Sequence, residues 1–110
     1  MLEEIKKAIE DATGIPFALF SWETAPVGDY GVVGLVGDIV TMCGDDAVQD
    51  YAVNGYIDII LSSAGDDVMV AVTEALKDFP NMWYDLDNVW YDKNIQRTHY
   101  MWHFARLVTA

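Results

Sequence analysis

The fold is decided by residues 51–61, which read YAVNGYIDIIL. Apolar residues or glycine stand at every second position from Val53 to Leu61, and Asn54, Tyr56 and Asp58 stand between them. Successive side chains of a strand point to opposite faces of a sheet, so this pattern predicts a strand with one packed face and one wetter face. The apolar segment extends back to residue 47, which predicts a strand over 47–61.

The segment before this strand predicts its hairpin partner. Residues 30 to about 42 are rich in Val, Ile and Gly, and Cys43-Gly44-Asp45-Asp46 separates them from the next strand. We expect a long hairpin of strands 30–42 and 47–61, whose tip protrudes because it has more residues than a small core requires. Gly31, Gly34 and Gly37 predict bulges, bends or close backbone approach, since no Lys-Ser/Thr follows them as in a phosphate-binding loop.

Two segments have the 3.6-residue period of surface helices. The first places Leu2, Ile5, Ile9 and Ala12 on one stripe and ends at Thr13-Gly14. The second follows several potential N-cap oxygens in residues 62–67 and ends before Pro80. Its apolar stripe consists of Val68, Met69, Val72, Ala75, Leu76 and Phe79.

The remaining segments complete one domain over residues 1–110. Residues 15–22 predict a short strand, residues 23–29 a loop, and residues 81–91 and 96–109 an aromatic hairpin around 92–95. The expected fold is α+β, in the order α-β-β-β-α-β-β, with two helices packed on a mainly antiparallel sheet. The matching apolar faces should bury Ile57, Ile59, Leu61, Val72 and Leu76 together.

Charge and composition restrict the possible partners. The chain has 18 acidic and 6 basic residues, a net charge of −12, so most of its surface should repel nucleic acid and anionic membranes. The single cysteine, Cys43, cannot form an internal disulfide, which fits synthesis and assembly in a reducing cytoplasm. No run approaches the eighteen or so apolar residues of a membrane span, so we expect no membrane partner.

The aromatic content suggests an interface. Four Trp, six Tyr and four Phe give more aromatic surface than so small a core hides, and Trp and Tyr are enriched at contact hot spots. Trp83, Trp90 and Tyr91 are the candidate aromatic interface. The alternative is a Trp-rich core with ordinary partial exposure.

The patterns for catalysis are weak. His99 and His103 lie about 13 Å apart on a strand and cannot share a metal directly, and Cys43 has no His or basic neighbour in sequence to activate it. Asp38, Asp45, Asp46 and Asp50, around the hairpin tip, lack the spacing of a calcium loop. We therefore expect no catalytic residue, metal or cofactor; a pocket lined by His99, His103 and a carboxylate would revive an enzymatic role.

The organisation resembles the tail-terminator and tail-completion proteins of long-tailed bacteriophages. The resemblance spans nearly the whole chain and rests on the first helix leading into residues 13–18, on 51–59, on the helix around 67–76 and on the closing strand 98–104. It implies a ring, commonly of six subunits, at the tail–neck junction of the virion. Such a ring stops polymerisation of the tail tube protein, joins the tube to a head-completion or neck protein, and needs no catalytic residues.

A ring would also give the acidic charge a role. DNA leaving the head passes through the channel without specific binding, and an acidic lumen repels its phosphates. Asp38, Asp45, Asp46 and Asp50 are the candidate channel or hairpin-tip residues, although the same acidity can simply keep a protein soluble. The alternatives are a DNA-mimic inhibitor, which would be a monomer or dimer with two rows of carboxylates, and another neck or head-closure protein.

Overall fold

The computed structural model describes residues 2–36, 40–43 and 48–109. Its elements are α1 (Leu2–Thr13), β1 (Phe17–Leu19), β2 (Tyr30–Leu35), β3 (Val40–Cys43), β4 (Val48–Leu61), α2 (Asp66–Lys77), β5 (Met82–Asp92) and β6 (Arg97–Thr109). The strands form one sheet in the order β1-β2-β4-β6-β5, and β3 pairs with β4. Within the described residues β1 and β2 pair in parallel and the other pairs are antiparallel. The α+β prediction is therefore confirmed.

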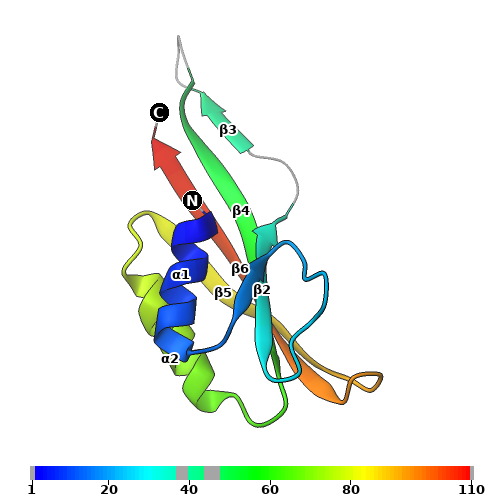
Figure 1. Cartoon of the computed structure of the whole chain (residues 1–110). Coiled ribbons are helices and arrows are strands. Elements are labelled where there is room, and N and C mark those ends of the chain that lie inside the picture. The colour runs from blue at the N-terminus through cyan, green and yellow to red at the C-terminus, as the bar shows by residue number, and fades with distance from the viewer. Residues whose placement is uncertain (1, 37–39, 44–47, 110) are drawn as a thin grey trace.

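The predicted strand 30–42 is two strands, β2 and β3, which both pair with β4. Leu35 pairs with Gly55 and Val40 with Ala52, so the chain advances five residues on one side and three on the other. The difference is two residues. Because this number is even, side chains of β2 and β3 with the same parity of residue number point to the same face of the sheet. Beyond β2, β4 lies between β3 and β6, and Figure 1 shows this arm projecting at the top.

The molecule is elongated. Its principal extents are 52 × 25 × 22 Å and its radius of gyration is 15.1 Å, against about 13 Å for a compact domain of this length. The arm of β3, β4 and β6 extends one end, and the β5–β6 hairpin extends the other (Figure 1). Both ends therefore lie away from the helices.

The core lies between the two helices and one face of the sheet (Figure 1). Alternate residues of β4 and β6 meet apolar side chains of both helices, as the two periodicities predict. The predicted joint burial of five side chains is confirmed: Ile57, Ile59, Val72 and Leu76 are 0% exposed and Leu61 is 2% exposed. The other buried members of this cluster are Ile5, Ile9, Ile15, Phe17, Val33, Trp102 and Phe104.

Helix α2 begins differently from the expectation. Its N-cap is Gly65, which has no side chain to cap the first turn, so the predicted side-chain cap oxygen is not used. Asp66 and Asp67 lie in the first turn, where carboxylates favour the positive end of the helix dipole. The helix ends at Lys77, before Pro80, as predicted.

Two glycines of β2 allow close packing against aromatic rings. A Cβ atom on Gly31 would lie 2.2 Å from the Phe17 ring, and one on Gly34 would lie 2.6 Å from the Tyr56 hydroxyl. These distances are too short for a side chain, which supports the close-approach interpretation for these two positions. Gly37 lies outside the described residues.

Candidate interaction surface

The sheet has a helix-free face, formed by the β4, β5 and β6 side chains that point away from α1 and α2. Strand pairing places Tyr56 of β4, His103 of β6 and Asp85 of β5 side by side on this face. Their sequence neighbours Ile57, Trp102 and Phe104 point the other way, into the core. The two faces of the same strands therefore differ sharply in chemistry.

The loop of residues 20–29 covers one part of the helix-free face. The Arg97 guanidinium donates hydrogen bonds to the Val27 and Gly28 carbonyls over 2.6 and 2.7 Å, and the Trp22 indole donates to the Gly31 carbonyl over 2.9 Å. Figure 1 shows this loop on the side of the sheet away from the helices. The part of the helix-free face nearer to Trp83 is not in contact with this loop through these hydrogen bonds.

A β-bulge in β5 decides which aromatic side chains share the helix-free face. Leu86 pairs with Trp102 but Asn88 pairs with the adjacent Met101, so one extra β5 residue stands between them. The extra residue reverses the alternation of faces along the rest of the strand. As a result Trp83 and Trp90, seven residues apart, both lie on the helix-free face, whereas Tyr91 lies on the opposite one.

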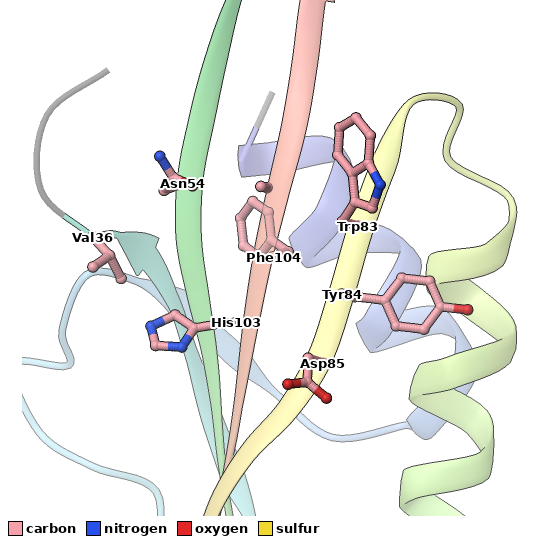
Figure 2. Close-up of a pocket in the computed structure, with 8 residues that line it drawn as sticks. Val36, Asn54, Trp83, Tyr84, Asp85, His103 and Phe104 are labelled. Atoms are coloured by element: carbon pink, nitrogen blue, oxygen red, sulfur yellow. The ribbon is translucent and has the colours of Figure 1, made fainter. Parts of the chain in front are cut away.

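A groove lies on this face between β5 and the end of β2. It has a volume of about 480 Å³, and its lining includes Val36, Asn54, Trp83, Asp85 and His103 (Figure 2). Trp83 is 63% exposed and Val36 is 40% exposed, so both apolar side chains are available for contact. Figure 2 shows the Tyr84 ring directed instead toward α2.

The groove is acidic as well as apolar. Within the described residues no cation lies within ion-pair distance of Asp85, while Asp87 pairs with His103 Nδ1 at 3.2 Å. A second hollow of about 280 Å³ shares Val36 and His103 with the groove and includes Asp87 and Trp90 in its lining. The surface thus combines aromatic area with carboxylates, which suits a partner with both apolar and basic groups.

His99 forms a separate cluster with Asp58, Trp90 and Asp92. Its Nδ1 lies 3.1 Å from both carboxylate oxygens of Asp58, and its Nε2 lies 3.5 Å from Asp92 Oδ2. The Trp90 ring stacks on the imidazole at 4.5 Å between centroids and an angle of 5°. This cluster connects β4, β5 and β6 at the base of the β5–β6 hairpin.

Burial raises the pKa of Asp58 above its ordinary value, and the charge and hydrogen bond of His99 oppose that shift. A neutral imidazole can donate from one nitrogen, whereas the imidazolium can donate to both carboxylates. Since the two acids lie at opposite nitrogens of the ring, they do not converge on one point. Within the described residues, no group of three or more His, Cys, Asp and Glu is arranged to hold a metal ion.

The two histidines are not brought together. His103 and Asp85 line the groove, while both nitrogens of His99 face carboxylates in its own cluster. An enzymatic role would need one pocket that contains both histidines and a carboxylate. These side chains do not form such a pocket.

The predicted acidic residues fall mostly outside the described structure. Asp38, Asp45 and Asp46 lie outside the described residues, and Asp50 lies in β4, where it pairs with Met42 and Thr109. Of the predicted aromatic interface, Trp83 is on the groove, Trp90 is stacked on His99, and Tyr91 is 58% exposed on the other face. Sequence reasoning did not identify Val36 or Asp85, because the groove depends on strand pairing and on the bulge.

Comparison with solved structures shows a fold match. No family model matches the chain, and no curated protein matches its sequence. A chain of the solved structure described as the virion of a native gene transfer agent particle superposes with a TM-score of 0.63 at 14% identity. The match covers 99% of this chain and 92% of that one, so the two share a fold over nearly their full lengths. None of the helices in the described part of the chain has the length and apolarity needed to cross a membrane.

Proposed function

We propose that this protein is a structural component of a phage-like virion and acts there as a ring-forming tail terminator. In this role it caps the tail tube, joins it to a head-completion or neck protein, and is located at the tail–neck junction. The observation that carries the proposal is the full-length fold match to a chain of a gene transfer agent virion. The resemblance of the sequence to tail-terminator proteins makes that role more specific, with six copies as the expected number.

The helix-free face supports a role in assembly. Large aromatic side chains contribute strongly to binding when a partner removes them from water. Trp83, 63% exposed beside a groove, is a side chain of this kind. A ring needs two such contact surfaces on every subunit, because each copy meets two neighbours.

The acidic arm supports passage of DNA without binding. Asp38, Asp45, Asp46 and Asp50 belong to the segment of residues 38–50, and we propose that this segment faces the channel or the next ring. Carboxylates in a narrow passage repel phosphates, so DNA would not adhere to the wall. No catalytic residue, metal or cofactor is part of this proposal.

The direct test combines oligomeric state with control of tube length. The purified protein should form rings by electron microscopy and should stop growth when it is added to the polymerising tail tube protein. A protein that stays monomeric or dimeric with the tube protein present, and leaves tube length unchanged, would reject the proposal. Tight binding of such a monomer or dimer to a DNA-binding enzyme would favour the DNA-mimic alternative.

A further inference from the structure

The β5–β6 tip, residues 92–96, is the best candidate to contact the groove. Figure 1 shows it projecting from the sheet on the side away from the helices. Ile95 is 42% exposed there, and Lys93 lies beside it in the turn. The tip therefore presents an apolar and a basic side chain together, the two properties that complement the groove.

Lys93 differs from the other basic residues of the chain. No described carboxylate lies within ion-pair distance of its amine, whereas each of the others has a carboxylate within 4.0 Å: Lys6, Lys7, Lys77, Arg97 and Arg106. In a chain with a net charge of −12, a lysine with no described carboxylate near its amine is available for an intermolecular ion pair. Asp85 in the groove is its counterpart, a carboxylate without a described cation.

The tip is held in a defined conformation. Asp92 Oδ1 accepts a hydrogen bond from the Asn94 amide over 2.9 Å, and its Oδ2 faces His99. On the other side of the turn, Arg97 is fixed to the carbonyls of the 20–29 loop. A preorganised tip loses little conformational freedom on docking, which favours association.

The tip cannot reach the groove of its own molecule. Asp85 and Lys93 are eight residues apart on or just beyond β5, which corresponds to roughly 25 Å along an extended strand. A contact between them must therefore join two copies. Because the tip and the groove are different surfaces, the contact is heterologous, and its repetition gives a closed ring or an open filament.

We propose that the β5–β6 tip of one copy docks in the groove of the next, with Lys93 against Asp85 and Ile95 against Trp83. This inference rests on the proposed function, since it names the contact that would build the ring. It gives each subunit one donor surface and one acceptor surface, at separate places on the elongated molecule. The ring then buries Trp83 and neutralises Asp85 at every interface.

Disulfide trapping tests the contact in the full chain. Lys93→Cys and Asp85→Cys are introduced together in a Cys43→Ser background, and the protein is oxidised at high concentration. Denaturing gels should then show a ladder of cross-linked oligomers that ends at the size of the ring. An equal mixture of the two single variants should give cross-linked dimers only, and a matched Lys77→Cys/Asp85→Cys chain should give no ladder.

Charge exchange gives a second readout that does not depend on disulfide chemistry. Lys93→Glu and Asp85→Lys should each weaken self-association roughly tenfold or more, because each places like charges together. The double exchange, Lys93→Glu with Asp85→Lys, should restore association. Single variants that assemble as well as the unmodified protein would overturn the inference.

The outcomes separate this contact from the proposed function. Normal rings without the Lys93–Asp85 cross-link would overturn the tip-in-groove contact and leave the ring proposal standing. A cross-linked ladder without a closed end, from a protein that forms no rings on the tail tube, would support the contact and reject the ring. Absence of both rings and cross-links would overturn both.

Discussion

The two faces of β4 and β6 have opposite properties, and β5 extends the helix-free face, although Leu86, Val89 and Tyr91 on the other side of β5 are also partly exposed. On the helix-covered face Ile57, Trp102 and Phe104 are at most 5% exposed. On the helix-free face the corresponding positions carry Tyr56, His103, Asp85 and a Trp83 that is 63% exposed. Burial by the helices explains the first face within one chain, and we propose that a second chain covers the exposed Trp83 of the second face.

The largest expected effect is on the helix-covered face. Leu76→Ala should lower the free energy of unfolding by about 2–5 kcal/mol, because Leu76 is 0% exposed between α2 and the sheet. Val70→Ala is the matched control on the same helix, since Val70 is 62% exposed and should change stability by only about 0.5 kcal/mol. Equal urea midpoints for the two variants would contradict the division between the faces.

The next largest effect is on association through the helix-free face. Trp83→Ala should leave the urea midpoint nearly unchanged but weaken self-association by about 2 kcal/mol or more, as loss of a hot-spot Trp does. Val70→Ala is the control, because Val70 is similarly exposed, at 62%, on α2 and belongs to neither the groove nor the tip. Sedimentation of both variants over a concentration series measures the difference; equal weakening would show that exposure alone, and not the face, governs assembly.

The four acidic residues around the hairpin tip should affect DNA passage more than stability. Replacing Asp38, Asp45, Asp46 and Asp50 by Lys changes the charge by eight units per subunit, since each of four residues goes from −1 to +1. Folding should be nearly intact, because a surface charge contributes little individually and we propose that these four side chains face the channel or the next ring. Assembled variant rings should bind DNA in a salt-dependent way, and particles built with them should lose infectivity. Unchanged DNA binding with full infectivity would place these acids outside the channel.

The smallest expected effect concerns the His99 cluster. Burial raises the pKa of Asp58 above its ordinary value of 3.8, so the folded state favours the protonated carboxyl group. The contribution of protonated Asp58 to folding stability is fully present below pH 3.8, the ordinary pKa. It is lost as the pH rises through the raised pKa that Asp58 has in the folded state. Asp58→Asn, which keeps an oxygen acceptor for His99, should therefore raise the urea midpoint at pH 7, and the gain should disappear toward pH 3.8. A variant that is less stable at pH 7 but not at low pH would show that the ion pair outweighs the cost of burial.

The sequence was sufficient for the helix-covered face. The alternation of residues 53–61 and the helical spacing of Val72 and Leu76 predict which side chains meet, because burial on one face produces a periodic pattern. The fold order and the hairpins followed from the same patterns and from turn residues. The structure has two strands, β2 and β3, within the predicted strand 30–42, because apolar composition alone does not show where one strand ends and the next begins.

The helix-free face was less accessible to sequence reasoning. Without the bulge between Leu86 and Asn88, Trp83 would share a face with Tyr91 instead of Trp90, so the composition of the aromatic surface depends on one extra residue. The groove joins Asp85 of β5, His103 of β6 and Val36 just after β2, and these residues meet only through strand order, pairing and the bulge. Strand pairing likewise brings His99 together with Asp58 and Asp92.

We propose that the helix-free face joins copies of this chain into a closed ring. Mass measurement of the unmodified protein in solution, over a range of concentrations and with the tail tube protein present, tests it most directly. We predict one closed species at an integer multiple of the 12.3 kDa chain, with six as the expected number. A protein that remains at 12.3 kDa under all these conditions would contradict the account.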